Sequence, residues 1–100
     1  MNKTEARYAQ YLDTMVRLGQ VRSHLYEGIK LRLADKKTFY TPDFFVVRPD
    51  MTIECHEVKG FWRDDARIKI KVAATLFPFR FVAVKAQTKR DGDGWEFEQI

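Results

Sequence analysis

Three charged side chains have the types and spacing that phosphodiester chemistry uses: Asp43, then Glu57 fourteen residues later, followed by Lys59. Glu57 and Lys59 are two residues apart on a predicted strand, so both side chains leave the same face. If Asp43 stands opposite Glu57, the two carboxylates repel by roughly a few kcal/mol at about 4 Å and need a cation. Mg²⁺ prefers such oxygen ligands and can activate a water molecule. Lys59 would orient or deprotonate that water, or stabilise the negative charge that grows on phosphorus.

The register of one hairpin decides whether the two carboxylates meet. A two-residue loop would set Asp43 opposite His56, on the other face of the sheet. A three-residue loop over residues 49–51 sets Asp43 opposite Glu57 and makes one face apolar near the turn and charged at its far end. We therefore predict the three-residue loop, with His56 facing away from Glu57 and given no catalytic role. This register also aligns Phe45 with Cys55 and Val47 with Ile53.

The elements that must position these residues follow from hydrophobic periodicity and from turn residues. The pattern predicts helices over Thr4–Leu18, with Thr4 as the N-cap, and over Asp64–Phe77. It predicts strands over Ile29–Ala34, Phe44–Val47, Thr52–Lys59, Phe79–Ala86 and Trp95–Glu98. Residues 22–28 are interpreted as a polar connector in which His24 is a bystander, and Lys36–Lys37 as a basic turn. The order α-β-β-β-α-β(-β) predicts an α/β fold, a mixed sheet with helices packed on it, whose third and fourth strands are parallel.

The segment over residues 64–77 carries two conflicting signals. Residues 67–72 alternate apolar and basic side chains, as a strand does. Asp64 is a good N-cap, however, and one helical face collects the apolar residues Ala66, Ile70, Ala73 and Phe77. We favour the helix.

Glu5 lies on the apolar stripe of the first helix, within about 20° of the direction of Leu12. The other members of this stripe are Tyr8, Met15 and Val16. Two interpretations of Glu5 are open. It is either a first-turn acid, favoured by the helix dipole and wetted at the end of the stripe, or a carboxylate that faces the rest of the protein and serves its chemistry.

Length and composition limit the chain to a single domain over residues 1–100. Hydrophobic residues make up 45% of the chain, enough for a packed core, and the net charge of +4 suits a polyanionic partner. The single cysteine, Cys55, cannot form an internal disulfide and is expected in the core. The sequence shows neither a signal peptide nor an apolar run that would span a bilayer, so we expect a cytoplasmic protein without a membrane partner.

The charged residues and their surroundings resemble the PD-(D/E)xK nuclease superfamily. The similarity is greatest to its short phage-encoded branch, in which a Glu-x-Lys-Gly-aromatic segment leads into a basic helix. The matching segments are Pro42–Asp43 and Glu57–Trp62, and the resemblance extends from Glu5 to about Val84. It implies a restriction-endonuclease-like fold.

The resemblance also implies a role for each residue of the motif. The implied ligands of Mg²⁺, or of Mn²⁺ as a substitute, are Asp43, Glu57 and the backbone carbonyl of Val58. Lys59 would be the catalytic lysine. Glu5 would be the first-helix glutamate that supports the metal, directly or through water.

Basic side chains are candidates for binding nucleic acid, namely Arg63, Arg67 and Lys69 beyond the motif strand, and Lys36 and Lys37 in the basic turn. The alternative for those beyond the motif is an ordinary solvated helix face, and Lys69 and Lys71 cannot both face the site. Phe61 and Trp62 could stack on a splayed base, although a core position is the more frequent role of such residues, particularly for Phe61.

The sequence therefore predicts a Mg²⁺-dependent endonuclease that hydrolyses DNA phosphodiester bonds, with branched or phage DNA among its candidate substrates. The alternative is a non-catalytic α/β module that binds nucleic acid or a protein and whose carboxylates form ordinary ion pairs. A homodimer is expected, with Phe77–Phe79 or the strand around Trp95 as its interface. For a phage-encoded chain, the compartment would be the cytoplasm of the host cell.

Overall fold

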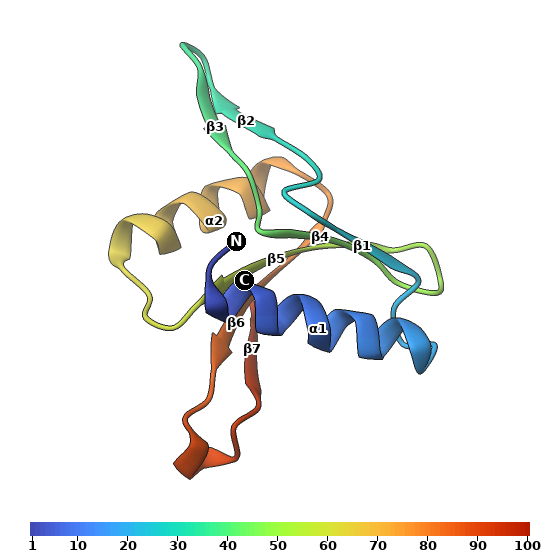
Figure 1. The fold of residues 1–100 in the computed structure, drawn as a ribbon. Helices are drawn as coiled ribbons and strands as arrows, with labels where there is room; N and C mark the ends of the chain where they lie inside the picture. Colours follow the sequence, from blue (N-terminus) through green and yellow to red (C-terminus); the bar gives the residue numbers. More distant parts are fainter.

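A mixed sheet of five strands, in the order β1-β4-β5-β6-β7, forms the centre of the computed structural model, which describes residues 1–100 (Figure 1). Its strands are β1 (Ser23–Tyr26), β4 (Phe44–Val47), β5 (Ile53–Lys59), β6 (Arg80–Ala86) and β7 (Trp95–Gln99). Strands β5 and β6 are parallel, as predicted, and the other neighbouring strands are antiparallel. A short 3₁₀ turn, η1 (Lys89–Asp91), lies between β6 and β7.

Two helices, α1 (Lys3–Arg17) and α2 (Asp64–Leu76), pack on opposite faces of this sheet. Successive side chains of a strand point to opposite sides, so each face can contribute to its own core. The core beneath α1 contains Tyr8, Leu12, Val21, Phe44, Val46, Val58, Val82 and Val84. The core beneath α2 contains Leu31, Tyr40, Cys55, Ile70, Ala73 and Phe81. The expected α/β fold, a mixed sheet with helices packed on it, is confirmed at this level. Neither helix has the length and apolar character needed to cross a membrane.

The hairpin of β4 and β5 has the predicted register. The alignments of Phe45 with Cys55 and of Val47 with Ile53 are both present. The Arg48 N–H donates to the Thr52 carbonyl at 2.9 Å, which closes the three-residue loop. Continued by one pair beyond the end of β4, this register sets Asp43 opposite Glu57.

Both helices form where the sequence predicts them, but both predicted caps are wrong. Asp64 is the first helical residue of α2, and the N-cap position belongs to Arg63, whose side chain makes no capping hydrogen bond. The N-cap of α1 is not Thr4 but Asn2, whose side chain accepts the Glu5 N–H at 2.8 Å. Asn2 is favoured because the Glu5 side chain in turn accepts the Asn2 N–H, so two amides at the start of the helix are satisfied at once.

Residues 22–28 are not a connector, because they contain the edge strand β1, which pairs with β4. The polar composition of this strand concealed it, since an edge strand has only one neighbour and one buried face. His24 is also not a bystander: its Nε2 lies 2.7 Å from Asp13 Oδ1 of α1. The sheet therefore begins with β1 and not with Ile29–Ala34.

The strand predicted over Ile29–Ala34 is present, but its predicted position in the main sheet is wrong. Strand β2 (Leu31–Ala34) leaves the main sheet and pairs only with β3 (Thr38–Tyr40). The two strands form a hairpin that projects beyond α2 (Figure 1). Alternation of apolar and basic side chains specifies a half-buried strand, but it does not specify which sheet buries it.

The base and the tip of this hairpin differ in environment. Leu31 and Tyr40, at the base, are buried against α2. Lys36 and Lys37, at the tip, are exposed and adopt left-handed conformations, with φ of 61° and 64°. The predicted basic turn is thereby confirmed.

Candidate active site

The candidate site lies where β4 and β5 separate. The last pair between these strands is Phe44 with His56, so the next amide of β5 that faces β4, that of Val58, has no partner in β4. The Asp43 carboxylate supplies the partner, because its Oδ2 accepts the Val58 N–H at 2.8 Å. This hydrogen bond fixes Asp43 beside the charged end of β5.

Glu57 is held by three groups. Its Oε1 accepts the Tyr40 hydroxyl at 2.9 Å and the Asp43 N–H at 3.2 Å. Its Oε2 forms an ion pair with Lys59 Nζ at 3.3 Å. Asp43 and Glu57 are both buried, whereas the Lys59 side chain is 37% exposed. The structure therefore brings the two acids and the lysine together at one partly open position.

The site holds more negative than positive charge. Burial raises the pKa of Asp43 above its usual range, and the charge of Glu57 raises it further. Glu5 adds to this effect, whereas the Val58 N–H and Lys59 lower the pKa of Asp43. Burial alone would lower the pKa of Lys59, but the attraction of Glu57 and Asp43 outweighs burial and raises it. A bound cation would relieve the repulsion between the acids.

Glu5 lies in the first turn of α1, as its first interpretation has it, but it faces the interior and is only 9% exposed, so it is not a wetted acid. Its Oε1 accepts the Asn2 N–H at 2.8 Å and the Tyr26 hydroxyl at 3.2 Å. Its charge acts on both Asp43 and Lys59. Glu5 thus closes the first turn of α1 and at the same time adds negative charge to the site.

The residues present fit a hard divalent cation. Carboxylate oxygens are the ligands that Mg²⁺ and Mn²⁺ prefer, and Oδ1 of Asp43 has no hydrogen-bond partner. The Val58 carbonyl leaves β5 on the same side as its N–H, and therefore toward Asp43. No three His, Cys, Asp or Glu side chains lie close enough together to form a metal-binding group by themselves. A cation here would use two carboxylates, the carbonyl and water, which suits Mg²⁺, an ion that usually keeps several waters.

Two tyrosines that hold the acids were missed in the sequence. Tyr40 donates to Glu57 from the end of β3, and Tyr26 donates to Glu5 from the end of β1. Burial and the charge of Glu57 raise the pKa of Tyr40 far above its usual value, so its hydroxyl remains a donor.

Lys69 is the basic candidate that the structure places beside the acids. It lines a hollow of about 300 Å³ together with Glu57 and Lys59. Lys71 lines a different hollow on the far side of α2, which agrees with the expectation that both lysines cannot face the site. Arg63 is exposed at the start of α2, where it occupies the N-cap position.

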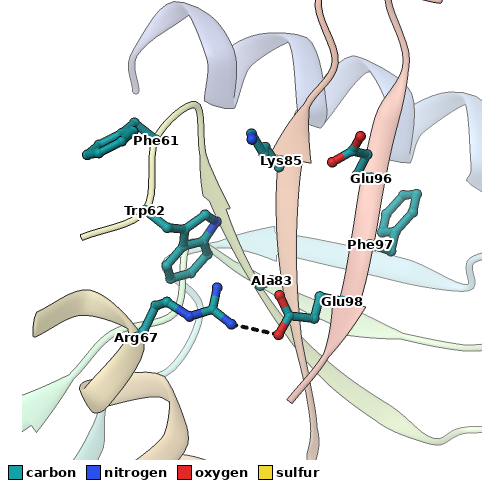
Figure 2. Close-up of a pocket in the computed structure, with 8 residues that line it drawn as sticks. All are labelled: Phe61, Trp62, Arg67, Ala83, Lys85, Glu96, Phe97 and Glu98. Atoms are coloured by element: carbon teal, nitrogen blue, oxygen red, sulfur yellow. Dashed lines mark hydrogen bonds and ion pairs between the residues drawn. The ribbon is translucent and has the colours of Figure 1, made fainter. Parts of the chain in front are cut away.

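Arg67 already has partners in a separate pocket of about 410 Å³ (Figure 2). Its guanidinium forms an ion pair with Glu98 at 2.6 Å and lies 5.7 Å from the centre of the Trp62 ring. Trp62 is half-buried against the core beneath α2. Phe61 is 78% exposed, so a core position is wrong for it, because the chain has left β5 by this point and the residue lies in the following loop.

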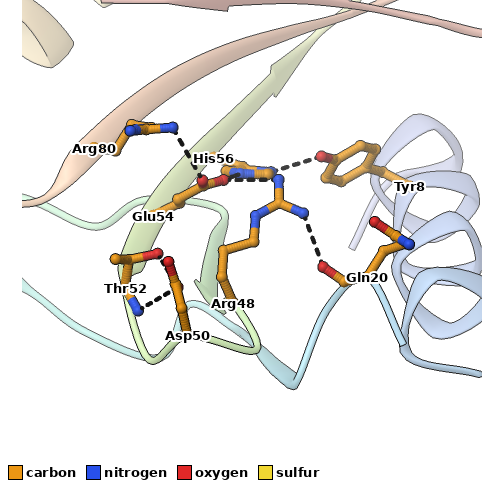
Figure 3. Close-up of polar contacts among 8 residues, drawn as sticks. All are labelled: Tyr8, Gln20, Arg48, Asp50, Thr52, Glu54, His56 and Arg80. Carbon is orange, nitrogen blue, oxygen red and sulfur yellow. Dashed lines mark hydrogen bonds and ion pairs between the residues drawn. The ribbon is translucent and has the colours of Figure 1, made fainter. Parts of the chain in front are cut away.

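His56 lies on the sheet face opposite Glu57, as predicted, within a buried polar network beneath α1 (Figure 3). Its Nδ1 is 2.6 Å from the Tyr8 hydroxyl, and its Nε2 is 2.8 Å from the Glu54 carboxylate. Arg48 donates to the same carboxylate at 2.9 Å. Because His56 is 1% exposed and bonded at both nitrogens, its role in this network is structural.

We expect the free energy of unfolding to depend less strongly on pH in the acid range in Glu54→Gln than in the wild type. Burial alone would raise the pKa of Glu54, but hydrogen bonds from His56 and Arg48 outweigh burial and lower it to about 2. A carboxyl group with a lower pKa in the folded than in the unfolded chain stabilises the fold above its ordinary pKa, and this contribution disappears as the pH falls from about 5 to about 2. Urea unfolding across this range should show a loss smaller by roughly 2 kcal/mol in the variant than in the wild type.

A matched control for this experiment is Asp35→Asn, since the Asp35 side chain is fully exposed. This control should follow the acid dependence of the wild type. Parallel curves for the wild type and Glu54→Gln would contradict the prediction.

No family model matches the chain, and neither a curated protein nor a solved structure matches it. Two buried acids beside an amine, at the point where two strands separate, can hold a hard cation and attract a phosphate to the same place.

Proposed function

We propose that this chain is a metal-dependent phosphodiesterase. More narrowly, we propose a Mg²⁺-dependent endodeoxyribonuclease of the PD-(D/E)xK type with a restriction-endonuclease-like fold. The observation that carries the proposal is the meeting of Asp43, Glu57 and Lys59 where β4 and β5 separate. Buried paired acids with one amine are unfavourable without a cation, and they suit its binding.

Each group has its own task in this proposal. The metal-holding groups are Asp43, Glu57 and the Val58 carbonyl, with Glu5 acting through water. When bound, Mg²⁺, or Mn²⁺ in its place, polarises the phosphate and lowers the pKa of its water. Lys59 places a positive charge beside the phosphate oxygens on which negative charge develops. Tyr40 keeps the Glu57 carboxylate oriented through its hydrogen bond of 2.9 Å.

The distribution of charge supports DNA as the substrate. The chain has a net charge of +4, and Lys69 lines the hollow next to the acids. Positive charge around a site attracts the phosphates of a nucleic acid. A homodimer would supply two sites for two strands, and the stacked rings of Phe77 and Phe79, with centroids 6.3 Å apart, are the candidate interface.

Nicking of supercoiled plasmid tests the proposal. The wild type should nick the plasmid in Mg²⁺ and not in EDTA, and Lys59→Ala should lower the rate by about 10²–10³-fold, because the positive charge beside the phosphate is lost. Lys71→Ala is the matched control, since this lysine lies on the neighbouring helix but lines a different hollow. A wild-type protein that binds the plasmid but fails to nick it, whichever metal ion is added, would favour the alternative, a non-catalytic binding module.

A further inference from the structure

The hairpin of β2 and β3, with the residues that lead into it, has a strongly positive net charge. Residues 29–40, here named the basic arm, contain four basic side chains and a single acid, a net charge of +3 out of the +4 of the whole chain. The basic members are Lys30, Arg32, Lys36 and Lys37, and the acid is Asp35. The arm projects from the body of the protein beyond α2 (Figure 1). Its charge is thus presented on a narrow ribbon with solvent around the tip.

The tip of the basic arm runs against conformational preference. Lys36 and Lys37 lie in the turn between Ala34 and Thr38, and both have positive φ. Asn-Gly is a favoured pair in such turns, and a non-glycine residue in this region costs about 1 kcal/mol or more. The two lysines therefore place charge at the tip at a cost in stability.

The base of the basic arm borders the candidate active site. Phe39 and Tyr40 of β3 line the same hollow as Glu57. From Tyr40 to Lys37, a strand rises by about 10 Å, at about 3.3 Å per residue. Duplex DNA rises by about 3.4 Å per base pair, so the tip stands about three base pairs away from the site.

From these observations we infer that the basic arm lies in the major groove of duplex DNA, with Lys36 and Lys37 on phosphates about three base pairs from the bond that is cut. The inference rests on the proposed function for its substrate. The major groove admits a two-stranded β-ribbon, whereas a single strand has no groove. Lysine binds phosphate as a point charge, so the arm positions the duplex and does not read its sequence.

The double variant Lys36→Asn/Lys37→Gly tests this inference, because it removes both charges and installs the favoured turn. Binding of a fluorescent duplex is measured by anisotropy in EDTA, which prevents metal-dependent cleavage, over a series of salt concentrations. We expect the slope of log K against log salt to decrease in magnitude by about 1.8, and the affinity at about 0.1 M salt to fall roughly 60-fold. The melting temperature should rise, which excludes unfolding as the cause.

The matched control is Lys89→Gln/Arg90→Gln, which removes two exposed charges from η1, at the opposite end of the molecule from the arm (Figure 1). Its salt slope should equal that of the wild type. A wild-type slope and affinity in the arm variant would overturn the inference even if the wild type nicks plasmid. The same measurement is made with a fluorescent single strand, and an equal loss of affinity of the arm variant for duplex and single strand would overturn the groove placement. A wild type that binds no DNA would overturn the inference entirely. Arm-dependent binding of duplex by a protein that never cleaves would support the inference while refuting the proposed nuclease.

Discussion

Asp43→Asn is expected to stop metal-dependent cleavage and to leave the protein folded and at least as stable as the wild type without metal. Asparagine keeps an oxygen that accepts the Val58 N–H and removes a buried negative charge beside Glu57. Loss of a metal ligand removes several kcal/mol of transition-state stabilisation, which corresponds to a rate decrease of about 10³-fold. Initial rates of plasmid nicking in Mg²⁺ measure this effect.

Thermal unfolding separates loss of the metal from loss of the fold. Mg²⁺ or Mn²⁺ should raise the melting temperature of the wild type, since only the folded chain contains the site, and should leave that of Asp43→Asn unchanged. Asp50→Asn, in the exposed loop at the other end of the same hairpin, should keep both the metal-induced shift and the cleavage rate. Equal metal-induced shifts in the wild type and Asp43→Asn would show that the metal binds elsewhere.

Tyr8→Ala is expected to cause the largest loss of stability. Tyr8 is completely buried, and its ring packs on Phe44 and Trp95 with centroids 5.4 and 5.0 Å away. Truncation of a buried aromatic ring costs about 3–5 kcal/mol, and this variant also leaves His56 Nδ1 without its partner. Urea titration at neutral pH should show a decrease of at least about 4 kcal/mol in the free energy of unfolding.

Tyr8→Phe isolates the polar part of this effect. Because ionised Glu54 can only accept, the network places the proton of His56 on Nε2, and Nδ1 accepts from the Tyr8 hydroxyl. Removal of the hydroxyl leaves a buried acceptor unsatisfied, at a cost of about 1–3 kcal/mol. Tyr11→Phe, a half-buried neighbour with no hydroxyl hydrogen bond, is the control and should be nearly neutral. A Tyr8→Phe variant as stable as the wild type would mean that this hydrogen bond makes no net contribution.

The register of the β4–β5 hairpin could be predicted because two constraints agree there, namely the apolar side chains that must share one face and the length of the loop. A slip by one residue exchanges the two faces of a strand, and only one loop length keeps Phe45 and Val47 on the same face as Cys55. Helix α2 could be predicted for a similar reason, since Ile70 and Ala73 are neighbours only at helical spacing. Local pattern suffices where it also defines the buried face.

Strand β1 and the basic arm could not be placed in this way, because their partners are decided by contacts distant in sequence. In β1 the apolar Leu25 is 59% exposed and the polar His24 is half-buried, so the sequence lacks the usual alternation of buried apolar and exposed polar residues. Strand β2 has a clear alternation, but its buried residue Leu31 packs against α2, an element that begins more than thirty residues later. A periodic pattern indicates that a face is buried and does not identify what buries it.

The same distinction applies to the candidate site. The meeting of Asp43, Glu57 and Lys59 follows from strand periodicity and from one hairpin register, so it could be predicted. The contacts of Tyr40 with Glu57 and of Tyr26 with Glu5 could not be predicted. These tyrosines lie at the ends of β3 and β1, two strands whose positions in the fold the sequence did not indicate. Groups that orient a site are thus harder to find than the groups they orient, since their types are less distinctive.

Cys55 is completely buried at the centre of the sheet, and burial raises its pKa to about 12. The thiolate is the form that attacks thiol reagents, so the folded chain is protected against them twice, by lack of access and by lack of the reactive form. The single thiol of this protein is therefore an intrinsic probe of the transient opening of its central strand, β5. The rate at which it is labelled reports how often β5 is exposed, with no engineered probe to disturb the fold.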